Sequence, residues 1–439
     1  MEDGTTGRGV VTAPPQADFF ASEGRALAET ILEQVRLLSP DSAGVWRPAY
    51  SVTETRVLDY LEGVARSHGL IAWRDGGANL VMARPGDSDP SARCGVIGSH
   101  VDSVPQGGNF DGLAGVVTAM LSLIAMERVG IETAIPVRAI ALRAEESACF
   151  GMAYVGSQAL FGLLEAKALA TRDAHADRSL AEAMASCGVD MARVAAGTPL
   201  IDAAAIAFFL ELHIEQGPIL IDRGWPVATV TGIRGNLRHR AIRCLGSAGH
   251  SGAVPRWLRH DAVMATADLL VGMDEHWSEI LQQGGDLVMT AGIFHTDASH
   301  NAMSRIPGET TFSFEARSQH AATLEAVEAL LHAECERVAR DRGVRFDFDA
   351  PVRTPEAMLD AGVAAALRDA CATEGLPTET VPSGAGHDAA IFQIAGVPSG
   401  MLFVRNANGS HNPDEAMELD DLLHGVRVMH RAATTLAGA

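Results

Sequence analysis

The sequence has little cysteine, and its cysteines form no recognisable pattern. The six residues lie far apart and include no C-x-x-C pair: Cys94, Cys149, Cys187, Cys244, Cys335 and Cys371. This scatter excludes a disulfide framework and a cysteine-rich zinc site, and it is typical of reduced thiols in the cytosol.

Long apolar runs and an apolar leader are also missing. No run approaches the ~20 residues that cross a bilayer. The stretch MEDGTTGRGVVTAPPQ at the N-terminus has acids near its start and no apolar core of a secretory signal. We interpret residues 1–18 as a flexible tail and expect a cytoplasmic protein with no membrane partner.

Basic residues are too few to balance the acids. The 34 Lys and Arg residues against 55 Asp and Glu give a formal net charge of −21. This charge argues against nucleic acid or an anionic membrane as a partner, because both require a basic face. It says little about a substrate, since a local arginine cluster can hold an anion within an acidic protein.

The chain is long enough for more than one domain. Its 439 residues suggest two or three. From about 227 to 341 the order ββαββα is typical of a small sheet with helices on one face: strands at 227–233, 238–245, 286–295 and 310–317, helices at 261–282 and 321–340. We predict an α/β catalytic domain with a mixed, helix-flanked sheet, residues 19–226 and 342–439, and an inserted α+β domain, residues 227–341.

The stretch CGVIGSHVDSVPQGGNFDGLAG, residues 94–115, carries the first candidate site. A short apolar strand leads to His100, and Asp111 follows a glycine-rich turn and precedes an apolar run, 113–126, typical of a buried helix. Both side chains are then expected at the ligand-binding edge of an open sheet. Histidine with aspartate suits a borderline metal such as zinc. An ordinary strand–turn–helix with a solvated histidine fits the same pattern.

Two further apolar runs, 135–142 and 205–214, end near side chains of the same kinds. The candidate metal ligands are His100, Asp111, Glu146, His213 and His411. Five ligands exceed the need of one catalytic zinc and suit two metals with a bridging carboxylate, for which the glycine-flanked Asp111 is the natural choice. Glu145 is then free to accept a proton from water. A solvated acidic pair is the alternative for residues 145 and 146.

Six motifs in order carry a resemblance to a known family: GSHVDSVPQGGNFDG, RAEESACFG, ELHIEQGP, GSAGHSGAVP, SGAGHDA and FVRNANGSHNPDEA. They resemble the cocatalytic zinc amidohydrolases and, within these, the hydantoinase/carbamoylase family of N-carbamoyl-L-amino-acid hydrolases, allantoate amidohydrolases and β-ureidopropionases. The match covers about residues 95–415. ELHIEQGP is its most specific part, because related peptidases and aminoacylases usually have an acid where this sequence has His213.

The resemblance implies a role for each of these residues. One zinc would be held by His100, Asp111 and His213, and the other by Asp111, Glu146 and His411. Glu145 would be the general base, and Asp102 would hold a ligand histidine in place. The inserted domain would be a lid that also dimerises, and its His250 would stabilise the oxyanion. A plain turn residue is the alternative for His250.

The substrate residues follow the family less closely. Arg317 resembles the arginine that binds the substrate carboxylate, although a surface salt bridge fits it too. Gln216 and residues 384–387 (Gly384, Ala385, Gly386 and His387) would line the pocket. Ser304 stands where the family commonly has Asn, with Asn301 three positions earlier. Because Arg234, Arg305 and Arg405 also depart from the family pattern, we expect a substrate with more, or differently placed, anionic or polar groups.

The favoured expectation is a binuclear amidohydrolase that cleaves the ureido bond of a small carboxylate, such as an N-carbamoyl-L-amino acid, and releases ammonia and carbon dioxide. Its cofactors would be two divalent ions, zinc first, with manganese, cobalt or nickel as other candidates. An aminoacylase or dipeptidase is the alternative enzyme. A non-catalytic metal- or ligand-binding protein is the alternative class, which the intact Glu145 and ligand set argue against.

Overall fold

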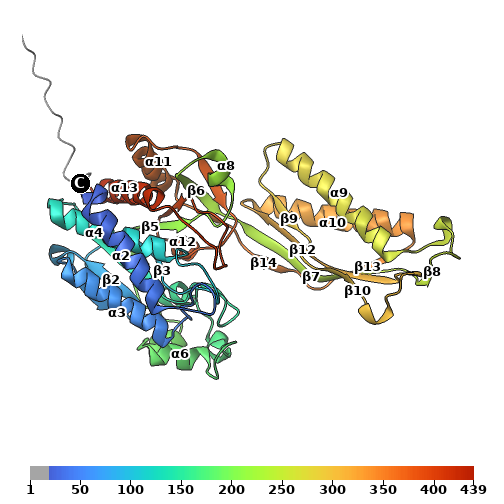
Figure 1. Cartoon of the computed structure of the whole chain (residues 1–439), viewed down its shortest axis with the longest axis horizontal. Coiled ribbons are helices and arrows are strands. Elements are labelled where there is room, and N and C mark those ends of the chain that lie inside the picture. The colour runs from blue at the N-terminus through green and yellow to red at the C-terminus, as the bar shows by residue number, and fades with distance from the viewer. Residues whose placement is uncertain (1–18) are drawn as a thin grey trace, which may run out of the picture. The chain divides into compact units, whose positions relative to one another are not determined.

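The computed structural model describes residues 19–439 (Figure 1). The segment 1–18, expected to be a tail, lies outside the described residues. The chain divides into two compact units. The first unit contains the described residues up to Thr231, together with Leu359–Val381 and His387–Ala439, and the second contains Gly232–Met358 and Pro382–Gly386.

The first unit is built on a large mixed sheet. Its strand order is β1 (Ile71–Arg74), β2 (Leu80–Ala83), β4 (Val137–Leu142), β3 (Cys94–His100), β5 (Ile206–Ile214), β17 (Ser399–Val404) and β6 (Val227–Ile233). The four central strands, β4, β3, β5 and β17, are parallel. The flanking strands β2 and β6 run antiparallel to them. The carboxyl ends of the four parallel strands therefore meet at one edge.

Helices cover both faces of this sheet, which explains why its central strands are apolar without interruption. On β5, Phe208, Leu210 and Leu212 belong to the core that also includes α4 (Leu113–Val129) and α13 (Leu419–Leu436). Phe209 points to the other face, since successive strand residues alternate, and stacks on Phe392 of α12 (Asp388–Ile394) with ring centroids 3.8 Å apart. The other helices of this unit are α2 (Glu23–Leu38), α3 (Val52–Ser67), α5 (Val155–Leu160), α6 (Leu180–Ser186), α7 (Met191–Ala195), α8 (Ile219–Arg223) and α11 (Ala361–Thr373).

The second unit is a smaller antiparallel sheet with two helices. β12 (Glu309–Ser318) pairs with β7 (Gly235–Leu245) along most of its length and alternates buried with part-buried residues. Helices α9 (Ala262–Gln282) and α10 (Ala321–Arg342) share a core with its buried face. The other strands of this sheet are β9 (Val288–Thr290), β10 (Phe294–Thr296), β13 (Arg345–Asp347) and β14 (Val352–Thr354). β8 (Gly249–His250) and β11 (Arg305–Ile306) pair only with each other, and β15 (Ala357–Met358) and β16 (Thr380–Ser383) pair with β6 of the large sheet.

The α/β fold class is confirmed, but three expectations about elements were wrong. Residues 227–233, expected in the small sheet, form β6 and pair with β17 in the large sheet, where six of the seven residues are buried. The single strand expected at 286–295 is two strands, β9 and β10. The alanine-rich composition of residues 152–197 predicts a helical stretch, but the structure has only short helices there, because turns at Gly162 and Gly188, both with positive φ, interrupt it.

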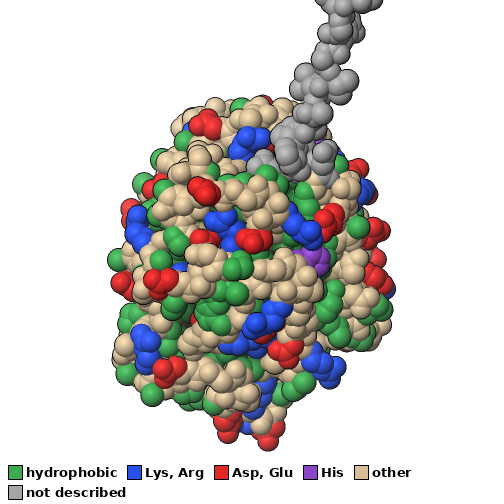
Figure 2. All heavy atoms as spheres, turned by 90° about the vertical axis from the view of Figure 1, so that its left-hand side faces the viewer, with side chains coloured by type: hydrophobic (Ala, Val, Ile, Leu, Met, Phe, Trp, Pro, Cys, Tyr) green, Lys and Arg blue, Asp and Glu red, His purple; other side chains and the backbone are tan. Residues whose placement is uncertain are grey.

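The first unit has a charged surface over its apolar core. Acidic and basic side chains are interspersed on the face of the first unit that Figure 2 shows. Within residues 19–439, no helix has the length and apolar character needed to cross a membrane.

We predict that His430 makes the stability of the first unit fall in mild acid. Its ring is 5% exposed, packs edge-on against Phe20 and donates from Nδ1 to the Ser122 carbonyl oxygen at 3.3 Å. Burial lowers the pKa of His430 to about 4, so the unfolded chain binds the extra proton and stability is lost as pH falls from about 6.5 to about 4, by about 3 kcal/mol. Chemical denaturation across this range should show a shallower pH dependence for His430→Gln. The exposed His295→Gln is the control, and equal slopes for His430→Gln and the wild type would contradict the prediction.

Candidate metal centre

The expected ligands meet at the carboxyl edge of the parallel strands. His100 is the last residue of β3, His213 is the penultimate residue of β5, Glu146 follows β4, and His411 follows β17. Asp111 lies in the loop between β3 and α4. The topology thus brings together side chains from the ends of two strands and from three loops at the edge where open α/β sheets place their ligand sites.

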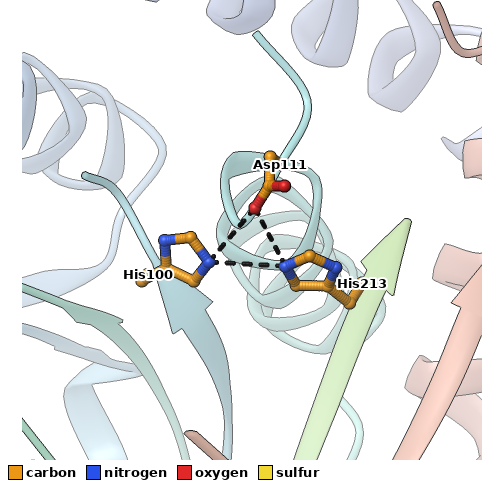
Figure 3. A group of neighbouring side chains, drawn as sticks. All are labelled: His100, Asp111 and His213. Carbon is orange, nitrogen blue, oxygen red and sulfur yellow. Dashed lines mark hydrogen bonds and ion pairs between the residues drawn. The ribbon is translucent and has the colours of Figure 1, made fainter. Parts of the chain in front are cut away.

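The first group of ligands is His100, Asp111 and His213. Figure 3 shows the two imidazole rings and the carboxylate converging from β3, β5 and the loop before α4. The Asp111 Oδ1 atom lies 3.4 Å from His100 Nε2 and 3.2 Å from His213 Nε2, and the two Nε2 atoms are 3.3 Å apart. The Nδ1 atoms point away, toward the carbonyl oxygens of Asp102 and Ile214. All three side chains are buried.

The second group shares Asp111 with the first. His411 Nε2 lies 3.5 Å from Asp111 Oδ2 and 3.2 Å from Glu146 Oε1. The two oxygens of Asp111 therefore face different groups, as a bridging carboxylate requires. His411 itself has φ +61, a left-handed conformation that non-glycine residues hold chiefly where surrounding structure enforces it.

The residues present fit a pair of divalent ions. In each group the ligand atoms lie within 4.8 Å of one another. Asp111 Oδ1 and Glu146 Oε1 are buried and accept no hydrogen bond from any residue in 19–439. A buried carboxylate oxygen without a donor is costly, whereas a cation between these oxygens and the imidazole nitrogens would satisfy it. Nitrogen and oxygen donors of this kind suit zinc and neighbouring metals.

The carboxylates of the centre favour positive charge. Burial opposes the charged form of His100, but Glu145, Asp102 and Asp111 outweigh it and raise its pKa well above the usual value. The Glu146 carboxylate, 3.2 Å from Nε2, raises the pKa of His411 to about 9, against burial. The same negative field would stabilise a bound metal ion.

Asp102 holds the turn that presents Glu145 and Glu146. Its two carboxylate oxygens accept the backbone N–H groups of these residues, each at 3.0 Å, and Oδ1 lies 3.4 Å from His100 Nδ1. The preceding residue, Ala144, has φ +56. Burial raises the pKa of Glu145 well above its usual value, with further contributions from neighbouring carboxylates and opposition from His100. A raised pKa suits a carboxylate that accepts a proton near neutral pH.

Two residues near Asp111 were not assigned from the sequence, and a third has a different contact from the one expected. Glu415 accepts the N–H groups of Phe110 and Asp111 at 2.8 and 3.2 Å. The Ser410 hydroxyl lies 2.5 Å from Asp111 Oδ2 and 2.6 Å from Glu415 Oε2. Gln216, expected in the pocket, donates from Nε2 to Asp111 Oδ2 at 2.7 Å. Ser410 and Glu415 flank His411 in the GSHNPDE motif, which is the signal that could have found them.

The expected substrate residues divide between the units. His387, in the first, is buried, with its ring centroid 4.4 Å from that of His213. Gln216 also belongs to the first unit, whereas the others lie in the second. His250 is exposed on β8, and Asn301 and Ser304 are exposed too, with the Ser304 carbonyl oxygen accepting the N–H of Ser251 at 2.9 Å. Arg317 donates to the Gly384 carbonyl oxygen and lies 3.0 Å from Glu315. Ala385 accepts from the Ser383 hydroxyl, and Gly386 ends this segment.

The arginines that suggested an unusually anionic substrate have partners of their own. Arg234 binds both carboxylate oxygens of Asp286. Arg405 binds both oxygens of Asp421 at 2.8 and 3.0 Å. These pairs neutralise two of the three additional positive charges, so the basis for expecting extra anionic groups on the substrate is largely removed.

The fold and the donor set define an α/β protein whose sheet edge offers histidine and carboxylate ligands for divalent ions. Comparison with known proteins gives the family: the model of peptidase family M20/M25/M40 matches residues 96–435. The chain belongs to this family, whose members are metal-dependent, and it is a hydrolase of carbon–nitrogen bonds.

Curated relatives and solved structures agree with the resemblance seen in the motifs. The chain is 33% identical over 419 residues to an N-carbamoyl-L-amino acid amidohydrolase of Geobacillus stearothermophilus, covering 94% of this chain and 99% of the relative. It is 30% identical over 333 residues to allantoate amidohydrolase of Escherichia coli, covering 76% and 78%. The structure of a hydantoinase/carbamoylase family amidase from Burkholderia ambifaria superposes with a TM-score of 0.83 at 29% identity, covering 94% and 96%.

We predict that Gly112→Ala disrupts the first ligand group. Gly112 has φ +66, and a Cβ there would lie 2.5 Å from the His100 ring. The affinity of the metal-free protein for zinc, measured by calorimetric titration, should fall at least about ten-fold. Gly130→Ala is the matched control, because Gly130 has φ +68 with open space around it. This control should lose about 1 kcal/mol of stability and keep its zinc affinity. Equal zinc affinities for both variants would contradict the prediction.

Proposed function

We propose that the protein is a two-metal amidohydrolase that cleaves the ureido group of a small carboxylate, an N-carbamoyl-L-amino acid or a related ureido acid. The observation that carries the proposal is the position of Asp111, whose two oxygens face two separate ligand groups. The names of the relatives, which include N-carbamoyl-L-amino acid amidohydrolase and allantoate amidohydrolase, support the substrate class.

The metal ligands and Glu145 each have a part in the proposed reaction. His100, Asp111 and His213 hold one ion, and Asp111, Glu146 and His411 hold the other. When bound, zinc ions supply Lewis-acid activation of water and of the substrate carbonyl; manganese, cobalt and nickel are alternatives. Glu145 accepts the proton of the attacking water and transfers it to the leaving nitrogen as the C–N bond breaks. The carbamic acid released from a ureido group then decomposes to ammonia and carbon dioxide.

The remaining assignments rest on the resemblance. His250 stabilises the oxyanion, Arg317 binds the substrate carboxylate, and Gln216, Asn301, Ser304 and residues 384–387 shape the pocket. We also propose that the protein works as a cytoplasmic homodimer through its second unit. The apolar side chains on the outer side of α9, Met264, Val271 and Leu281, support this, since each is about half exposed or more.

The test of the function is a substrate panel given to the zinc-loaded protein. The panel contains N-carbamoyl, N-acetyl and dipeptide derivatives of the same amino acids, together with allantoate, and both ammonia and free amine are measured. Release of ammonia from the ureido compounds alone is the expected result. Cleavage confined to the acyl or peptidyl compounds would replace the proposal with an aminoacylase or dipeptidase. No cleavage by protein with both ions bound would overturn it.

We predict that Glu145→Gln abolishes turnover but keeps the metals. The amide fills the same space but cannot accept the proton, so kcat should fall by about 10²–10⁴-fold. Glu146→Gln is the matched comparison and should lose one ion per chain, measured by atomic emission after dialysis. Near-normal kcat in Glu145→Gln would assign the base to another residue.

We predict that Arg317→Ala raises KM for carboxylate substrates at least ten-fold, because a bidentate contact to the carboxylate is lost. Arg238→Ala serves as the control, since Arg238 also binds Glu315 from the neighbouring strand β7. An unchanged KM in Arg317→Ala would transfer the role to Arg305, since Arg234 is already bound by Asp286.

A further inference from the structure

Arg47 is a charged residue buried completely in the first unit. It lies in the segment between α2 and α3, and its side chain has no exposed surface. Within residues 19–439 it forms no ion pair, and its Nη2 atom has no hydrogen-bond partner. A buried cation of this kind is unfavourable for folding unless the surroundings compensate it, so its presence calls for a specific role.

The guanidinium joins the two ends of the loop that carries the first metal ligands. Its Nε donates to the carbonyl oxygen of Val101, the residue between His100 and Asp102. Its Nη1 donates to Asn109 Oδ1 at 3.2 Å, two residues before Asp111. The Arg47 backbone adds a third point of contact. Its N–H donates to Ser103 Oγ at 2.9 Å, and its carbonyl oxygen accepts from the Ser103 N–H at 3.1 Å.

The surrounding charges explain how Arg47 stays charged without a direct partner. Burial lowers its pKa to about 10, and the carboxylates of Glu415, Asp102, Asp111 and Glu146 oppose this shift. Arg47 is therefore still protonated at neutral pH. It lies behind the acidic centre and contacts the chain that positions the ligands instead of the ligands themselves.

We propose that Arg47 is a positioning residue of the metal centre: its planar fork fixes both ends of the loop from Val101 to Asn109, so that His100 and Asp111 face one ion. Lysine would bring the same charge but only a compact ammonium group, which cannot span the two acceptors as the fork does. The proposal rests on the metal-dependent function argued above, and it concerns metal binding in the absence of substrate.

The test compares Arg47→Lys with Arg138→Lys in the full-length, metal-free protein. Arg138 is a matched control, because it is also buried and donates to two backbone carbonyls, those of Asp89 and Pro90, from the opposite end of β4. Zinc affinity is measured by calorimetry and ligand geometry by the visible spectrum of the cobalt form, with the melting temperature of each metal-free variant as a check on folding.

We expect Arg47→Lys to bind zinc at least ten-fold more weakly and to show an altered cobalt spectrum, while Arg138→Lys keeps wild-type values of both. Wild-type affinity and spectrum in folded Arg47→Lys would overturn the proposal. So would a loss in Arg47→Met that Arg47→Lys does not share, because charge and not the fork would then be responsible.

A second variant keeps the test decisive if Arg47→Lys does not fold. Asn109→Leu removes one acceptor of the fork and leaves Arg47 in place, and it should weaken zinc binding in the same direction by about three-fold or more. Wild-type zinc affinity in this variant would overturn the proposal. Failure of the zinc-loaded wild type to cleave any panel substrate would instead overturn the proposed function, and the zinc titrations would still decide the role of Arg47.

Discussion

The site depends on a single carboxylate, that of Asp111, which serves both ligand groups, one with each oxygen. One oxygen faces the two buried histidines and the other faces His411, so a small rotation of this side chain would disturb both groups together. The surrounding chain restricts that rotation. Glu415 binds the backbone of the loop, Gln216 and Ser410 contact Oδ2, and glycine at position 112 leaves room for the His100 ring. The site is thus held largely by hydrogen bonds to residues that are not ligands, as is usual for metal centres.

The parts of the site that the sequence predicts are those that follow from strand ends. Apolar runs before His100, Glu145 and His213 predict strands, and parallel strands in one sheet bring their carboxyl ends together. Histidine and carboxylate at those ends then predict a metal site. The residues that hold the ligands in place are harder to predict from the sequence. Glu415 is one acid among 55 Asp and Glu residues, and only its hydrogen bonds to Phe110 and Asp111 distinguish it. The same holds for Arg47, whose role depends on contacts more than fifty residues away in the chain.

Strand membership and charge pairing were the other points that local pattern could not determine. Residues 227–233 have the composition of a half-buried strand, but β17 covers one edge of β6 and makes it part of the large sheet. The partners of Arg234 and Arg405, Asp286 and Asp421, lie 52 and 16 residues further along the chain. A single sequence shows that these arginines are present, whereas only the fold shows that their charges are already balanced.

The order of strands in the large sheet has a consequence for how the chain acquires its structure. β17 lies between β5 and β6 but is the last of the three to be synthesised. Until residues 399–404 emerge from the ribosome, one edge of β5 and the edge of β6 that pairs with β17 have no partner in the sheet, and unpaired strand edges of this kind invite association with other chains. His411 lies in the loop after β17, so the second ligand group is also incomplete until this part of the chain has been made. The part of the chain that closes the sheet and the part that completes the second ligand group are thus synthesised together, and a chain truncated before β17 would lack both.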